Sequence, residues 1–288
     1  MARRRRSGLA NDSRVYVYGK CCKSSPKIRV IIRINNIATF SQGVWVLKEQ
    51  TVILIGQTLT VSNGIYLSIP FDQSLINNGE IINNGTINIS GTLLNEDSGI
   101  INNSISGVIN NVDFGIIYNA GQASIINNAY VIFNSNFGRI INYAKINNNG
   151  GTIDNNGSFY NEYYDAEYIG VINNTDGANI INGNGSATFV NNSTIDNNNS
   201  SIINVGIFNN NGDNGLINNK NNSIINNNSN ATIYNNSNAT IINNIGATFL
   251  NDGIINNADG TSLCGIGYIN QLSAITGIGE FGTECPPP

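Results

Sequence analysis

A five-residue repeat recurs through the middle of the chain. Each copy has a small residue, a variable residue, a large apolar residue, a second variable residue and Asn. Clear copies are Gly91–Asn95, Gly151–Asn155, Ala187–Asn191, Ala231–Asn235, Ala239–Asn243 and Ala247–Asn251. In an extended chain, places one, three and five face one side, and places two and four face the other. Each copy is therefore predicted to be a short β-strand with one buried side.

Asn-Asn, Asn-Gly or Ser-Asn pairs follow the copies, and these residues favour turns. Many copies start six to eight residues after the previous one, as at Ala231, Ala239 and Ala247. Short strands joined by regular turns are typical of solenoids. We therefore predict an all-β fold, a single-stranded parallel β-helix (β-solenoid) with three short faces per coil. Units grouped by two or by three would give coils of roughly 14 to 24 residues.

The side of each strand that carries places one, three and five is predicted to face inward. Asn at place five tolerates left-handed backbone, and its side chain can bond to the next Asn along the axis, which would form a ladder. Residues 71–260 contain 53 Asn, so ladders could be extensive. The outward positions include Glu80, Arg139, Asp154, Asp196 and Tyr234.

Composition divides the chain into four segments. These are a basic flexible arm (1–13), a β-rich N-terminal cap with the first coils (14–70), the Asn-rich β-solenoid (71–260) and a C-terminal cap or docking tail (261–288). A cap is expected because the open end of a solenoid is an unpaired sheet edge.

The charge is distributed unevenly. Residues 1–48 hold 11 Lys and Arg and one acid, net +10, whereas residues 49–288 hold three cations and 17 acids, net −14. The arm of Arg3, Arg4, Arg5 and Arg6 is predicted to dock an acidic partner, with a localisation signal as an alternative. Nucleic acid is not the expected partner, because the acidic rod would repel phosphates.

One stretch, Ser158 to Tyr168, departs from the repeat and is rich in Tyr and acids. One interpretation is an irregular loop over the rod. The other is a partner or glycan patch, because exposed Tyr and carboxylates are common contact residues. The patch residues would be Tyr160, Glu162, Tyr163, Tyr164, Asp165 and Tyr168.

The residue types needed for catalysis are scarce. The chain has no His, and the rod has three cations and well-separated acids, so we predict no catalytic residues, no metal ligands, no cofactor and no enzyme activity. Asp154 and Asp196 share the fourth place of their repeats with Asn218. They could align on one face and bind Ca²⁺ or sugar, or they could simply be surface acids. No apolar stretch approaches the ~20 residues of a membrane span, so membrane insertion is not expected.

Four cysteines lie outside the repeat: Cys21, Cys22, Cys264 and Cys285. They are candidates for disulfides between the head of one subunit and the tail of the next. The alternative is bonding within each end, including Cys264 to Cys285. A head-to-tail bond within one rod is excluded by length, because the Cα atoms of a disulfide lie within ~7 Å.

The run Gly79–Leu93, GEIINNGTINISGTL, resembles the GTINNxGTI repeats of large β-solenoid surface proteins. Such repeats occur in adhesin-like bacterial proteins and in giant DNA viruses with AT-rich genomes. The resemblance covers about two thirds of the chain and implies a β-solenoid with a structural or adhesive role and no catalytic residues. Those adhesins normally have a secretion signal and are longer. We see no apolar signal segment here, which favours a virion or filament subunit assembled in the cytoplasm.

The first functional hypothesis is a structural subunit that assembles head to tail into a fibre, filament or virion surface layer, on a virion or as an extracellular filament. Its partners would be copies of itself and other virion or surface proteins, since the basic head complements the acidic rod. The alternative is an adhesin or receptor-binding fibre that recognises glycans. A third candidate, a carbohydrate-active enzyme, is disfavoured because such sites need clustered acids.

Overall fold

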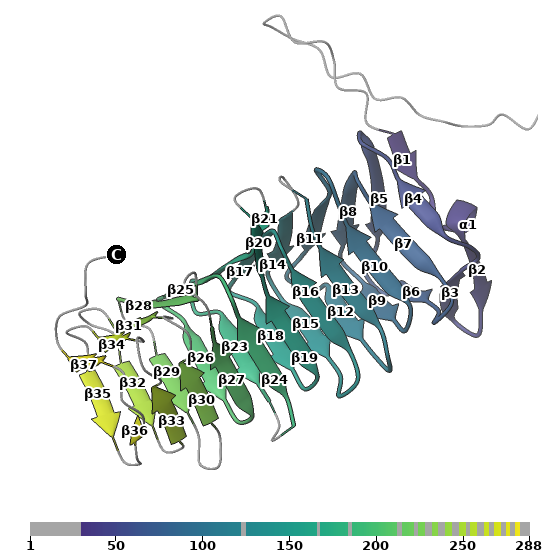
Figure 1. Ribbon diagram of the computed structural model, residues 1–288. Coiled ribbons are helices and arrows are strands. Elements are labelled where there is room, and N and C mark those ends of the chain that lie inside the picture. The colour runs from purple at the N-terminus through teal and green to yellow at the C-terminus, as the bar shows by residue number, and fades with distance from the viewer. Residues whose placement is uncertain are drawn as a thin grey trace, which may run out of the picture.

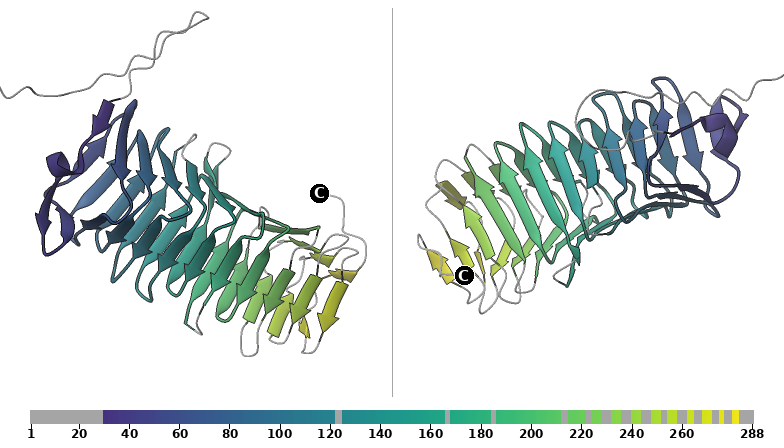
Figure 2. Two further views of the ribbon diagram at one scale, coloured as in Figure 1. Left: turned by 180° about the vertical axis from the view of Figure 1, so that it is seen from behind. Right: turned by 90° about the horizontal axis from the view of Figure 1, so that it is seen from above.

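The computed structural model describes residues 30–121, 125–165, 168–183, 186–211, 215–221, 224–227, 232–235, 240–243, 248–251, 254–257, 262–264, 268–271, 275–276 and 280–282. These residues form an elongated rod of short strands (Figure 1). Three long sheets run along the rod from one end to the other, as the views from behind and from above also show (Figure 2). The prediction of a β-solenoid with three faces per coil is confirmed.

We call the three sheets A, B and C. Sheet A has 12 strands, which are β1 (Val30–Ile32), β5 (Gln57–Val61), β8 (Glu80–Asn83), β11 (Ile100–Asn103), β14 (Ile125–Asn128), β17 (Lys145–Asn149), β22 (Val171–Thr175), β25 (Thr194–Asn198), β28 (Leu216–Lys220), β31 (Thr240–Asn243), β34 (Ser262–Cys264) and β37 (Glu280–Gly282). Sheet B has 12 strands, which are β2 (Ala38–Ser41), β3 (Val44–Leu47), β6 (Tyr66–Ile69), β9 (Thr86–Ile89), β12 (Val108–Asn111), β15 (Val131–Asn134), β18 (Thr152–Asn155), β23 (Asn179–Asn182), β26 (Ser201–Asn204), β29 (Ile224–Asn227), β32 (Thr248–Asn251) and β35 (Tyr268–Gln271). Sheet C has 11 strands, which are β4 (Thr51–Ile53), β7 (Ser74–Asn77), β10 (Thr92–Asn95), β13 (Ile116–Asn119), β16 (Arg139–Asn142), β19 (Ser158–Asn161), β24 (Thr188–Asn191), β27 (Ile207–Asn210), β30 (Thr232–Asn235), β33 (Ile254–Asn257) and β36 (Ile275–Thr276).

Successive strands pass from sheet A to sheet B to sheet C, and each strand pairs in parallel with its counterpart in the next coil. Equivalent residues of neighbouring coils are 18 positions apart at Asn77 and Asn95, and 30 apart at Asn161 and Asn191. Three units of the repeat therefore make one coil. The longest coils exceed the predicted range because loops are inserted between strands. One such insertion is a small two-stranded sheet of β20 (Tyr163–Asp165) and β21 (Tyr168–Ile169).

The N-terminal end departs from parallel pairing. β2 and β3 form an antiparallel hairpin at the end of sheet B. Its turn residues, Gln42 and Gly43, both have positive φ (50° and 85°), the backbone of a tight hairpin whose twist matches its strands. A single helical turn, α1 (Ile34–Ile37), connects β1 to this hairpin.

The alternation of buried and outward residues is confirmed. In β10, Leu93 and Asn95 are fully buried, while Thr92 and Leu94 are partly exposed, and most strands of the rod repeat this pattern. The small residue at place one is needed where coils touch. A Cβ atom added to Gly91 would lie 2.0 Å from the carbonyl oxygen of Pro70, closer than any real contact. The outward positions predicted from the sequence, such as Glu80, Arg139 and Asp196, do face outward.

The third place of the repeat builds the apolar core. Its Ile, Leu and Phe side chains stack in one column per sheet and are at most 3 % exposed. In sheet C, Phe189 stacks between Phe159 and Phe208, with ring centroids 4.5 and 4.7 Å apart and planes within 6°. Burial of these columns is the main favourable term for the fold.

The fifth place builds three buried Asn ladders, as predicted. The ladders run from Asn83 to Asn219 in sheet A, from Asn111 to Asn227 in sheet B and from Asn77 to Asn235 in sheet C, with Nδ2–Oδ1 distances of 2.7 to 2.9 Å. In many rungs the same amide also donates to a backbone carbonyl at a neighbouring corner; Asn142, for example, donates to Ala144. The ladders therefore satisfy polar groups that would otherwise be buried without partners.

All three ladders point the same way. Each Asn donates from Nδ2 to the Oδ1 of the Asn in the following coil, so the first Asn of a ladder receives no bond from a preceding rung. In sheet C the preceding place holds Ile53, and in sheet B it holds Ile89. The Oδ1 atoms of Asn77 and Asn111 are accordingly buried without a hydrogen-bond partner. Each ladder thus has a fixed direction, and those of sheets B and C begin at an unsatisfied acceptor. In sheet A the Oδ1 of the first residue, Asn83, accepts from the backbone N–H of Gly85 at 3.3 Å.

Candidate functional site

The outward side of sheet A carries a second, half-buried row of Asn side chains at the fourth place of the repeat. The row contains Asn102, Asn127, Asn147 and Asn173, which are direct neighbours in the register of the sheet. Each Asn donates from Nδ2 to the Oδ1 of the preceding one, at 2.8 to 2.9 Å. The first, Asn102, donates to the Glu80 carboxylate at 3.0 Å. This row therefore runs in the opposite direction to the buried ladders.

An open groove of about 840 Å³ follows this row. The five-residue strands β17, β22 and β25 supply its second row of side chains, because their last residues, Asn149, Thr175 and Asn198, also point outward and lie in register. The lining consists of Asn102, Ile105, Asn127, Asn128, Ala129, Asn147, Asn149, Asn173, Thr175, Asp196 and Asn198. The groove is thus long and lined mainly by amides, and Asp196 is the one ionisable residue among the described residues that line it.

The direction of the outward row is interrupted between β22 and β25. Asp196 occupies the place after Asn173 and accepts from Asn218 at 2.8 Å. A carboxylate can only accept, and Asn173 gives its N–H to Asn147. The pattern in which each side chain donates to the preceding one therefore stops at this step. The interruption was not predicted, because it depends on which residues the coils bring into register.

The prediction that Asp154 and Asp196 could align on one face is wrong. Asp154 lies in β18 of sheet B, whereas Asp196 and Asn218 lie side by side in sheet A. The two acids share a place in the repeat, but the sheet to which a copy belongs depends on how many copies and loops precede it. A site that joins both acids is excluded by this arrangement.

The surroundings of Asp154 are apolar. Its neighbours in the register of sheet B are Phe133 and Ile181. Burial raises the pKa of the Asp154 carboxyl, and a hydrogen bond from Asn156 at 3.1 Å offsets part of this effect. A pKa that is higher in the folded than in the unfolded chain means that ionisation of Asp154 opposes folding.

We expect Asp154→Asn to raise the melting temperature at pH 7, because the amide removes this ionisation and keeps an acceptor for Asn156. The gain should disappear below about pH 4, where the carboxyl is protonated in both states. Thermal denaturation at pH 7 and at a pH below about 4 checks this prediction. Asp72→Asn, the same substitution at an exposed position, is the control. An equal gain at both pH values, or a loss at pH 7, would contradict it.

The Tyr-rich stretch divides into a regular strand and an insertion. Its first part, Ser158–Asn161, forms β19 and obeys the repeat, with Phe159 in the core and Tyr160 outward. The departure from the repeat therefore begins at Glu162, later than predicted. The rest forms the β20–β21 hairpin at the corner between sheets C and A, where Tyr163 is 37 % exposed. The side chains of Tyr164, Asp165 and Tyr168 lie outside the described residues.

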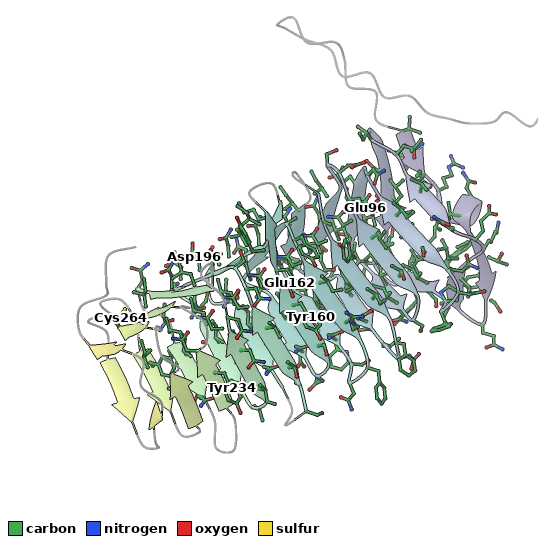
Figure 3. The ribbon with its side chains drawn as sticks, viewed as in Figure 1. Glu96, Tyr160, Glu162, Asp196, Tyr234 and Cys264 are labelled. Atoms are coloured by element: carbon green, nitrogen blue, oxygen red, sulfur yellow. The ribbon has the colours of Figure 1, made fainter. Side chains whose placement is uncertain are left out.

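Two patch residues belong to the outward face of sheet C. Tyr160 lies beneath the Arg139 guanidinium, 5.7 Å from Cζ to the ring centroid, and Glu162 accepts from Asn192 at 2.7 Å. Tyr118 and Tyr143 make a further ring contact on this face, at 5.6 Å. Figure 3 shows Asp196 apart from Tyr160 and Tyr234. Tyr160 and the groove are thus on different faces, because β19 belongs to sheet C and the groove lies on sheet A.

The N-terminal end of the rod is unusually apolar on its outside. Exposed large side chains gather there: Val30, Ile31, Phe40, Val52, Leu54 and Ile55. Ile31 and Ile55 are 57 % and 73 % exposed, and Val30 donates its N–H to Gly56, which brings their two segments together. β1, β2 and β4 are the outermost strands at this end. In the described part of the chain, each of these three strands is hydrogen-bonded to another strand of its sheet on one side only.

The remaining predicted residues fall mostly outside the described residues, including Arg3, Arg4, Arg5, Arg6, Cys21, Cys22 and Cys285. Cys264 is described in β34, where it is 2 % exposed and its sulfur lies 3.9 Å from the carbonyl oxygen of Ile241. Among the residues placed by the structure, no three Cys, Asp or Glu lie together as metal ligands. The described chain contains no helix long and apolar enough to cross a membrane.

No protein-family model matches the chain. No curated protein matches it. Among solved structures, it is similar to the crystal structure of a TibC-catalyzed hyper-glycosylated fragment of TibA, with 15 % sequence identity and a TM-score of 0.32. The similarity covers 81 % of this chain and 83 % of that one.

Proposed function

We propose that the chain is a non-catalytic structural subunit that assembles end to end, through its N-terminal end, into a fibre, filament or virion surface layer. The observation that carries this proposal is the cluster of exposed apolar side chains on the outermost strands, around Ile31 and Ile55. Exposed apolar patches of this kind mark contact surfaces, and outermost strands offer backbone groups to another chain.

Charge supports the same arrangement. The first 48 residues carry +10 and the remainder −14, so the head of one subunit attracts the rod of another. A contact between unlike ends does not close on itself and continues into a filament. Such a filament would lie on a virion or outside the cell, with other virion or surface proteins as further partners.

We expect Ile55→Lys to convert assemblies into monomers of 30.9 kDa, because it places a charge in the apolar end surface. Association should weaken by about tenfold or more. Light scattering after size exclusion measures this, with Ile105→Lys as the matched variant: Ile105 is also an exposed isoleucine, 81 % exposed, but lies on a corner along the rod. A wild-type chain that stays monomeric at all concentrations would contradict the proposal, as would equal effects of both variants.

The burial of Cys264 bears on how the subunits are joined. Cys264 is 2 % exposed and already disulfide-bonded, so its sulfur is not available to a neighbouring subunit, which favours its pairing within the tail, with Cys285. Non-covalent contacts would then hold the assembly. Covalent multimers of native material on non-reducing gels would instead support bonds between subunits.

A further inference from the structure

The groove on sheet A extends along the rod across five coils, from Asn102 in β11 to Asn198 in β25. Its two rows of side chains lie parallel to the rod axis, because each row takes one residue from each successive strand. A compact ligand would contact only one or two coils. A long, thin molecule lying along the axis would meet an outward amide in each coil from Asn102 to Asn173, and the second row in the three coils of β17, β22 and β25.

The chemistry of the lining selects for groups that both donate and accept hydrogen bonds. An Asn amide has two N–H donors and an acceptor oxygen, and the row uses one N–H of each amide for its neighbour. Each amide keeps a second N–H and a further acceptor lone pair with which it can bind a ligand in the groove. Hydroxyl groups match this alternation because each one donates and accepts.

The step between Asn173 and Asp196 adds a specific requirement. The amide that would follow Asn173 is replaced by the Asp196 carboxylate, which accepts from Asn218. A carboxylate accepts hydrogen bonds and cannot donate them, so this part of the lining favours a ligand group that donates. A hydroxyl group meets that requirement.

Charge disfavours polyanions in this groove. Residues 49–288 carry −14, and among the described lining residues Asp196 is the one that is charged. An anionic polymer is repelled by this net charge, whereas a neutral molecule is not.

From these observations we infer that the sheet A groove binds a neutral polysaccharide chain laid along the rod axis. Each coil contributes similar weak contacts, and the contacts add because they are held on one rigid surface. Affinity should therefore rise steeply with the length of the saccharide. The site is independent of the end surface proposed for assembly.

The test is isothermal titration calorimetry with the full chain carrying Ile55→Lys, so that assembly and binding are measured separately. The probes are cellohexaose, chitohexaose and mannohexaose, each with its disaccharide, and polygalacturonate as an anionic comparator, all in EDTA. At least one hexasaccharide should bind about tenfold or more tighter than its disaccharide, and polygalacturonate should not bind.

Two variants locate the site. Asn147→Leu removes the middle of the row and should weaken hexasaccharide binding by about tenfold. Its matched control is Asn110→Leu, which breaks an equivalent outward amide pair on sheet B, between Asn110 and Asn88 at 2.9 Å, and should leave binding unchanged. Asp196→Asn supplies a donor to Asn173, completes the row and should also weaken binding.

Several results would overturn the inference. They are no binding by any hexasaccharide, equal effects of Asn147→Leu and Asn110→Leu, unchanged affinity in both groove variants, or binding that appears only when Ca²⁺ replaces EDTA. The last result would assign the Asn173–Asp196 step to a cation. Circular dichroism of each variant confirms that the fold is retained.

Discussion

Phe189→Ala is expected to lower the free energy of unfolding by about 3–5 kcal/mol. The Phe189 ring is fully buried and stacked between Phe159 and Phe208. Its removal loses both ring contacts and leaves a cavity that neighbouring coils, held by hydrogen bonds above and below, cannot close. Denaturation in urea, followed by circular dichroism, measures the change.

Two variants control this result. Phe189→Leu keeps most of the apolar volume and should lower the free energy of unfolding less than Phe189→Ala does. Phe114→Ala removes a ring that stacks on Phe137 but is exposed on a corner, and should have a small effect. Comparable losses for Phe189→Ala and Phe114→Ala would contradict the arrangement of the core.

Asn142→Leu is expected to destabilise the rod by a similar amount, although leucine is the more apolar residue. Asn142 accepts from Asn119 and donates to Asn161, at 2.7 and 2.8 Å. Leucine removes the partner of three buried groups, which are one N–H of Asn119, the Oδ1 of Asn161 and the carbonyl oxygen of Ala144. Each unsatisfied group costs about 1–3 kcal/mol, so the loss should be about 3–9 kcal/mol.

The direction of the ladder gives a sharper form of this prediction. In Asn142→Asp the carboxylate still accepts from Asn119 but cannot donate to Asn161, and a charge is buried. Burial would raise the pKa of the new carboxyl, so this variant should recover stability as the pH falls and the acid becomes a donor. Urea denaturation at pH 7 and pH 4 measures this. Asn110→Leu, outside the core, should change stability little, and equal losses at both positions would contradict the ladder.

Much of the fold could be predicted because the repeat encodes it locally. Gly91–Asn95 shows which residues face inward, and an Asn that recurs at a buried place has few partners except the next Asn. The spacing of the copies leaves coils of two or three units open, and the preferred interpretation of three faces is the one that the structure confirms. The start of each ladder is also readable, because apolar residues such as Ile89 occupy the Asn place in the first coils.

The candidate site could not be predicted in the same way, because it depends on the position of each strand around the rod axis. Asp154 and Asp196 occupy equivalent places in sequence yet lie on different sheets. Insertions such as the β20–β21 hairpin change the spacing between equivalent residues without changing the repeat. The groove and the Asn173–Asp196 step arise from the register between coils, which the composition of single copies does not reveal.

Electron microscopy of native material tests end-to-end assembly most directly. We expect filaments one rod wide whose axial repeat equals the length of one subunit, about 50–60 Å for 12 strands spaced ~4.8 Å apart. Ile55→Lys should yield separate rods of that length, and Ile105→Lys should yield filaments. Separate rods in the wild-type material, or filaments that persist in Ile55→Lys, would contradict assembly through the N-terminal end.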